Sequence, residues 1–252
     1  MRITVFTIFP ELIEAACRPS ILGSAIEKGI LSVETVDPRE HTTDRHRKVD
    51  DIPFGGGAGM VMMPQPLSDA LDSALAAEGE RKPRVVFLTP GGRPLDQDTV
   101  RELANEESIF LVSGRYKGID DRVVRRYATD EISIGDYVLS GGELPALVVI
   151  DAVMRLLPGA LGDFASAEED SIHSGLLEVP LFTRPREFRG DEVPEVLISG
   201  HHEKIRRWRR REALKRTLLH RPELLESADL SKEDQQVLRE LKRDLDSGGT
   251  GE

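Results

Sequence analysis

Cysteine is almost absent from this sequence of 252 residues, because Cys17 is its only one. A single cysteine excludes an internal disulfide framework and fits a reducing compartment, so we expect a cytoplasmic protein. Cys17 lies in an apolar helical pattern, and we interpret it as a packing residue rather than a nucleophile. The histidines are scattered, without an HxxxH pair or a cysteine partner, so the sequence argues against a zinc site, and we assign no residue as a metal ligand.

Long apolar runs are also lacking, since none approaches the roughly 20 residues that a membrane helix needs. We therefore expect no membrane partner. The composition, with 39% hydrophobic and 31% charged residues, is typical of a soluble globular protein. A chain of this length can form one large domain or two modest ones.

Positive charge is in deficit, with a formal net charge of −11 at pH 7. Such a balance argues against a polyanionic partner. One segment departs from it: His201–Arg221 holds nine Lys or Arg and two Glu, a net charge of +7. Two interpretations remain open for this basic segment, a solvated charged face or a surface that binds nucleic-acid phosphates.

Familiar phosphate-binding motifs are missing, because the glycines form neither GxGxxG nor a P-loop with Gly-Lys-Ser/Thr. Instead, Pro53–Met60 holds four glycines in five residues, which core packing does not explain. This glycine-rich loop is either a flexible linker or a place where the backbone approaches a ligand closely.

Glycine also follows three successive apolar strands, in loops at Thr89–Gly92, Gly114–Gly118 and Gly135–Gly142. Strands alternate with helices in this region, which predicts an α/β fold with a parallel sheet. In such sheets ligands bind at the carboxyl ends of the strands. We therefore predict a pocket that is lined by the backbone of these three loops.

Apolar periodicity predicts the remaining elements. Strands are expected at 2–9, at 31–36, from 84 to the turn at 89–92, from 108 to Gly114 and at 132–134. Helices are expected at 10–17, 21–28, 65–77, 96–104, from 121, at 143–157, 201–220 and 231–245, the last begun by a Ser231-xx-Asp234 cap. The polar stretch Asp37–Asp51 is expected to be a loop, and Pro158–Gly175, which lacks periodicity, an interdomain linker.

Several motifs together resemble the bacterial tRNA (guanine-N1)-methyltransferases of the TrmD family. They cover about residues 3–225, and they are specific jointly rather than singly. The motifs are Ile8–Pro10, Asp44–Arg47 with Val49–Asp51, Phe54–Gly57 with Gly59–Met60, Gly114–Tyr116 with Gly118–Asp120, Ser133–Pro145, Glu169–Ser171, Phe182–Pro185 and Ile205–Arg209.

The resemblance implies a deep trefoil-knotted α/β domain of the SPOUT superfamily at residues 1–158, which binds S-adenosylmethionine. A linker at 159–175, a small helical tRNA-binding domain at 176–246 and a tail at 247–252 would follow. The implied activity is methylation of N1 of the guanosine at tRNA position 37, 3′ of the anticodon, which supports reading-frame maintenance. The implied partners are the tRNA anticodon stem-loop and a second subunit, in a homodimer with active sites at the interface.

The family's contacts carry over to this chain residue by residue. The implied cofactor contacts are Pro90, Gly114, Tyr116, Ser133, Ile134, Gly135, Asp136, Tyr137, Val138, Leu139, Gly141 and Gly142. The implied tRNA contacts are Asp50, Gly57, Gly59, Arg206, Arg207 and Arg210.

Two further residues match catalytic positions of the family. Guanine N1 carries a proton at neutral pH, so a base must remove it as N1 attacks the methyl group. Asp170 matches the family's base, and Arg155 matches the cation that stabilises charge on guanine O6. Without the resemblance, Asp170 is one acid among three in a solvated linker, and Arg155 is an arginine favoured by a helix dipole.

Two residues depart from the family pattern. Lys117 stands where the family commonly has Glu, a residue associated there with the methionine end of the cofactor and with magnesium. The resemblance therefore implies magnesium as a possible cofactor, and Lys117 puts its binding in doubt. Ala58 stands where many members have Pro, which loosens the glycine-rich loop.

Two other functions remain open. The chain could be a non-catalytic RNA-binding protein that kept the fold, for which Lys117 is the only support. It could also be a nucleotide-binding α/β enzyme that uses the glycine loops for phosphate.

Overall fold

The computed structural model describes residues 1–161 and 175–248. The chain separates into two compact units, Met1–Phe164 and Ala165–Glu252, and each is described by itself. None of the helices in the described ranges has the length and apolar character needed to cross a bilayer.

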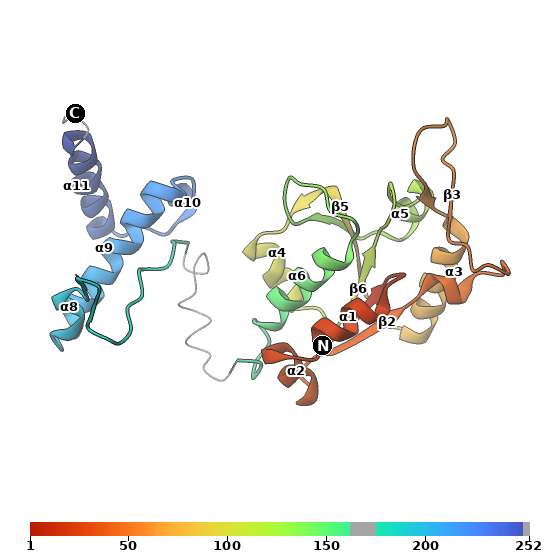
Figure 1. Cartoon of the computed structure of the whole chain (residues 1–252), viewed down its shortest axis with the longest axis horizontal. Helices are drawn as coiled ribbons and strands as arrows, with labels where there is room; N and C mark the ends of the chain where they lie inside the picture. Colours follow the sequence, from red (N-terminus) through yellow and green to blue (C-terminus); the bar gives the residue numbers. More distant parts are fainter. Residues whose placement is uncertain (162–174, 249–252) are drawn as a thin grey trace. The chain divides into compact units, whose positions relative to one another are not determined.

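A five-stranded sheet forms the centre of the first unit (Figure 1). The strands stand in the order β2-β1-β6-β5-β7, and every neighbouring pair is parallel. They are β1 (Arg2–Phe6), β2 (Ser32–Val36), β5 (Arg84–Pro94), β6 (Ser108–Ser113) and β7 (Asp130–Ser133). This sheet confirms the prediction of an α/β fold with parallel strands.

Helices cover both faces of the sheet. One face packs against α1 (Pro10–Cys17), α2 (Ser20–Glu27), α4 (Gln97–Ala104) and α6 (Glu143–Met154), and the other against α3 (Pro64–Glu78) and α5 (Asp121–Tyr127). In β6, Ile109 and Leu111 enter the first core, whereas Phe110 and Val112 enter the second. Successive side chains of a strand point to opposite faces of the sheet. A strand that is covered by helices on both faces therefore has a continuous run of apolar residues.

Cys17 lies in the first of these cores and is only 7% exposed. Burial raises the pKa of its thiol. Because the reactive thiolate is thereby disfavoured, the interpretation of Cys17 as a packing residue is confirmed.

The segment expected to be a loop, Asp37–Asp51, contains two short elements, so that prediction was wrong in part. They are a 3₁₀ helix, η1 (Pro38–His41), and β3 (Asp50–Asp51), which pairs antiparallel with β4 (Val61–Met62). Elements of two to four residues are too short for hydrophobic periodicity to reveal them.

The turn expected at Thr89–Gly92 is instead part of β5. A register shift between Leu88 and Arg93 interrupts the pairing with β7, after which Arg93 and Pro94 pair with that strand again. Such an irregularity bends a strand and leaves its extra residues unpaired. Gly91 and Gly92 therefore belong to a bulged strand rather than to a connection between elements.

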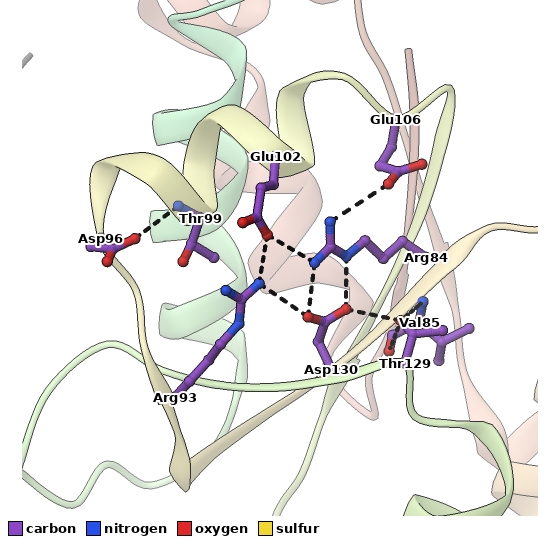
Figure 2. A network of polar contacts seen from close by, with 9 residues as sticks. All are labelled: Arg84, Val85, Arg93, Asp96, Thr99, Glu102, Glu106, Thr129 and Asp130. Atoms are coloured by element: carbon purple, nitrogen blue, oxygen red, sulfur yellow. Dashed lines mark hydrogen bonds and ion pairs between the residues drawn. The ribbon is translucent and has the colours of Figure 1, made fainter.

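An ion-pair cluster ties the two ends of this bulged strand together (Figure 2). Arg84 Nε lies 2.7 Å from Asp130 Oδ2, and Arg93 Nη2 lies 3.1 Å from Asp130 Oδ1. Both arginines also reach Glu102 of α4, at 3.1 and 2.9 Å. Hydrogen bonds from Arg84 lower the pKa of the Asp130 carboxyl. One acid at the start of β7 thus fixes both ends of β5, and Glu102 links them to the helix.

The second unit is helical with one short hairpin. Its core consists of Leu176, Ala213, Leu214, Leu238 and Leu241. The elements are β8 (Glu187–Phe188), β9 (Asp191–Glu192), α8 (Glu195–Ile198), α9 (His202–His220), α10 (Leu224–Ser227) and α11 (Lys232–Gly248).

Asp234 joins the two long helices of this unit. It accepts two hydrogen bonds from Arg210 of α9, at 2.8 and 2.9 Å. At the start of α11, Ser231 N donates to Asp234 Oδ2 and Asp234 N donates to Ser231 Oγ, which confirms the predicted cap. The pKa of Asp234 is lowered to about 2, and the largest cause is its hydrogen bonding with Arg210.

This lowered pKa predicts how the second unit responds to acid. The contribution of Asp234 to stability is complete above its ordinary pKa of 3.8 and is lost as the pH falls toward 2. Asp234→Asn should therefore cost roughly 1–2 kcal/mol at pH 7, and this deficit should shrink between about pH 4 and 2. Trp208, the single tryptophan, lies in α9, so its fluorescence during urea unfolding reports on this unit. A deficit that stays constant down to pH 2 would contradict the ion-pair account.

Candidate functional site

A cavity of about 380 Å³ lies where β6 and β7 end and β5 bulges. It is bordered by residues 87–90 of β5, by the loop at 114–119 and by the loop that follows β7. Its volume is in the range of small-molecule sites, and its place is the edge at which parallel sheets bind ligands.

The cavity brings together most of the residues predicted to contact a cofactor. Eleven of the twelve line it, from Pro90 to Gly142, and Asp136 does not. The two predicted loops after β6 and β7 therefore border one cavity, together with Thr89 and Pro90 of the bulged β5, whereas Gly91 and Gly92 do not line it. Residues outside the set of implied cofactor contacts, Thr89, Arg115, Lys117 and Ile119 among them, line it too.

Two glycines let the backbone of one segment touch that of another beside the cavity. A Cβ at Gly142 would lie 2.6 Å from Ser113 Cα, and Gly142 N donates to Gly114 O at 2.9 Å. A Cβ at Gly92 would lie 2.4 Å from the carbonyl carbon of Glu131. Neither position can accept a side chain unless the backbone moves.

Adjacent glycines in β5 provide a matched test of this constraint. Gly92→Ala should lower the free energy of unfolding by roughly 2–3 kcal/mol, because the new methyl group meets the backbone of β7. Gly91→Ala should change it by about 0.5 kcal/mol or less, since the nearest atom to its Cβ is Thr89 Oγ1 at 3.9 Å. Urea unfolding followed by circular dichroism measures both, and equal effects would show that β5 and β7 are not in close contact.

A buried carboxylate beside the cavity escaped prediction. Glu143, at the start of α6, is 1% exposed and accepts a hydrogen bond from Thr7 Oγ1 at 2.8 Å. Its Oε2 lies 2.9 Å from Arg115 Nε, an ion pair without hydrogen-bond geometry. The Arg115 guanidinium also lies 4.3 Å from the centre of the Phe9 ring. An acid in the first turn of a helix is favoured even when it is exposed, so the sequence carried no sign of this burial.

The glycine-rich loop joins β3 to β4 beside the cavity, so it is a hairpin loop and not a linker. Lys117 N donates to Met60 O, and Met62 N donates to Gly118 O, both at 2.9 Å. The Lys117 side chain lies along Gly59, because a Cβ there would be 3.0 Å from Lys117 Cγ. Lys117 therefore touches both the hairpin loop and the cavity.

The predicted tRNA contacts of the first unit lie on this hairpin. Asp50 is in β3, and Gly57 and Gly59 are in the loop that follows. The pKa of the Tyr116 phenol is raised, mainly by burial and secondly by the negative charge of Asp50. Asp50 is therefore close enough to influence a residue of the cavity wall.

Of the two predicted catalytic residues, only Arg155 lies within the described part of the chain, and it does not line the cavity. Asp170 lies outside the described residues. Arg155 is the C-cap of α6, whose first turn borders the cavity. The helix has 12 residues, so roughly 18 Å separate its ends at 1.5 Å per residue. Within one chain, Arg155 and the predicted cofactor contacts therefore lie at opposite ends of α6.

The three arginines predicted to bind tRNA lie on α9 of the second unit. Arg206 and Arg207 reach Glu203 at 2.9 and 3.2 Å, and both are largely exposed. Exposed pairs of this kind contribute little and leave the arginines able to meet another anion. Arg210 differs, because its bidentate contact with the buried Asp234 holds α9 against α11.

Comparison with known proteins gives one consistent family. The model of the family described as tRNA (Guanine-1)-methyltransferase TrmD matches residues 1–227. A tRNA (guanine-N(1)-)-methyltransferase of Heliobacterium modesticaldum is 57% identical over 97% of this chain and 92% of its own length. Proteins of the same name from Desulforamulus reducens and Pseudomonas fluorescens are each 54% identical, over 96% and 97% of this chain and 95% and 98% of their own lengths.

Proposed function

This chain belongs to the tRNA (guanine-1)-methyltransferase family, and we propose that it methylates N1 of the guanosine at tRNA position 37. S-adenosylmethionine is the methyl donor, and the anticodon stem-loop is the part of tRNA that is bound. The observation that carries the proposal is the cavity bordered by the bulged β5 and by the loops after β6 and β7, together with the near full-length match. Its tRNA substrate and single cysteine fit an enzyme of the cytoplasm.

The cavity suits S-adenosylmethionine in size and in chemistry. Its volume of about 380 Å³ fits a ligand of this class. Apolar side chains such as Ile132, Val138 and Leu139 can cover an adenine ring, while backbone N–H and C=O groups of the loops can bind its polar edge. When bound, the cofactor supplies a sulfonium methyl group that is open to in-line attack.

The protein's own part in the reaction is the handling of a proton and a charge. Asp170 accepts the N1 proton of guanine, which makes N1 a competent nucleophile. Arg155 donates to guanine O6, where negative charge accumulates as the proton leaves. Support for both roles comes from the family match, since both residues lie within the matched range.

A homodimer reconciles the place of Arg155 with this role. Because roughly one helix length separates Arg155 from the cavity of its own chain, it would act in the cavity of a second copy. Leu144 and Val148 support such an interface, because they lie one turn apart on α6 and are 54% and 45% exposed. Active sites between the two subunits follow from this arrangement.

The proposal includes the family's trefoil knot in a cofactor domain at 1–158, a linker at 159–175 and a tRNA-binding domain at 176–246. The knot is supported by the return of the chain after β7 to the end of β6. There Gly141 bridges to Arg115 and Gly142 N donates to Gly114 O. A chain that turns back in this way can pass through the preceding loop.

The role of Asp170 predicts a separation of binding from chemistry. Asp170→Ala should abolish methyl transfer to tRNA while leaving calorimetric binding of S-adenosylmethionine within about twofold, because only the base is lost. Asp170→Asn, which keeps the size but not the basicity, should fail in the same way. A variant whose rate stays within a few-fold of wild type would remove Asp170 from the mechanism.

The basic helix α9 predicts a salt-dependent contact with tRNA. Reversing Arg206 and Arg207 to Glu should weaken tRNA binding and reduce the slope of log affinity against log salt by about two. Binding of free S-adenosylmethionine should not change. Arg210→Gln provides a comparison for stability, because Arg210 holds Asp234 of α11, and it should lower the free energy of unfolding that Trp208 reports. Equal tRNA affinity of the reversed variant and wild type at low salt would refute the contact.

Lys117 predicts a weak dependence on magnesium. Its ammonium repels a divalent cation, and at an exposed site this costs about 1 kcal/mol or less. The described ranges also contain no group of three or more His, Cys, Asp or Glu that could hold a metal ion. Lys117→Glu should increase the response of the initial rate to added magnesium. Superimposable magnesium titrations of the two proteins would mean that Lys117 does not act on the metal.

A further inference from the structure

Two glutamates of the first unit are buried in the same manner at opposite edges of the sheet. Glu143 accepts from the Thr7 hydroxyl and forms an ion pair with Arg115. Thr7 directly follows β1, so this cluster lies at the carboxyl edge of the sheet, beside the cavity.

Glu78 has the equivalent partners at the other edge. It accepts from the Ser108 hydroxyl at 3.1 Å and forms an ion pair with Arg2. Arg2 begins β1 and Ser108 begins β6, so this cluster lies at the amino-terminal edge. Glu78 is 7% exposed and Glu143 is 1% exposed, so the two carboxylates are similarly removed from water.

Stability alone is a weak reason for burying such a pair. The desolvation of two charges offsets most of their attraction, and apolar residues of equal volume often stabilise a protein as well or better. Near the cavity the geometry is also imperfect, because Arg115 Nε and Glu143 Oε2 are close but not aligned as a hydrogen bond. The contact therefore fits a role in placing Arg115 better than a role in holding the fold together.

Arg115 connects two walls of the cavity. It belongs to the loop after β6, and its Nη1 donates to the carbonyl of Ser140 in the loop after β7, at 3.3 Å. The second loop rests directly on the ion pair, because a Cβ at Gly141 would lie 2.3 Å from Arg115 Nε and 2.6 Å from Glu143 Oε2. Glu143 itself does not line the cavity. Its effect on a bound ligand must pass through Arg115 and these two loops.

We propose that Glu143, held by Thr7, is a positioning residue for the methyl transfer. Its carboxylate keeps the Arg115 guanidinium between the loops at 114–119 and 137–142, and so holds both walls in the shape that receives S-adenosylmethionine. The inference rests on the proposed function. It differs from the catalytic assignments, because it concerns the form of the pocket and not the proton or the charge on guanine.

The test compares Glu143→Gln with Glu78→Gln in the full chain. Both remove one buried carboxylate charge that faces an arginine and a hydroxyl, so both should lower the melting temperature. Only Glu143→Gln should raise the Kd for S-adenosylmethionine by calorimetry, by about tenfold, which is the effect of losing one hydrogen bond or ion pair to a charged group. The KM for S-adenosylmethionine should rise in parallel, while kcat at saturation falls by about threefold or less.

A second comparison covers the case in which Glu143→Gln does not fold. Thr7→Val and Ser108→Ala each remove only the hydroxyl, and Thr7→Val alone should weaken binding of S-adenosylmethionine. The double variant Arg115→Gln/Glu143→Gln should bind it no more weakly than Arg115→Gln, because both changes break one contact.

The outcomes separate this inference from the function on which it rests. Wild-type protein that does not bind S-adenosylmethionine would overturn the proposed function. If the wild-type protein does bind it, two results would overturn the positioning role alone. One is a Kd that Glu143→Gln raises no more than Glu78→Gln does. The other is a Kd that Thr7→Val raises no more than Ser108→Ala does.

Discussion

Backbone contact at the carboxyl edge of the sheet is the constraint on which the rest of the first unit depends. Gly142 presses against Ser113, and Gly92 presses against Glu131, at separations that leave no room for a Cβ. Because these contacts join the segments around β5, β6 and β7, they fix the backbone that borders the cavity. A backbone held in this way offers N–H and C=O groups in fixed positions, which suits recognition of a polar heterocycle.

Charges are placed where they secure these contacts, although the chain as a whole is acidic. Asp130 forms ion pairs with Arg84 and Arg93, which lie at the two ends of the bulged β5. Glu143 forms an ion pair with Arg115, which lies between two walls of the cavity. In the second unit Asp234 uses Arg210 in the same way, to join α9 to α11. Arginine suits this work because its planar guanidinium can hold a carboxylate through two nitrogens or reach a second partner.

The sequence was informative where the chain is buried on both sides. The apolar run Ser108–Ser113 predicted a central strand, and the glycines after the strands predicted a common cavity. It was uninformative for β3 and β4, whose two residues each cannot show a period, and for the bulge in β5, which depends on pairing with β7. The burial of Glu143 could not be read either, since it arises from Thr7 and Arg115, which lie far from it along the chain.

The most direct measurement of the central claim, that these loops form an S-adenosylmethionine site, is calorimetric titration of the full chain. Parallel titrations with S-adenosylmethionine and with ATP distinguish a methyl-donor pocket from a nucleotide-phosphate pocket, because the loops contain no P-loop lysine. The account predicts saturable heat with S-adenosylmethionine and none with ATP. Saturation by ATP with no heat from S-adenosylmethionine would contradict it.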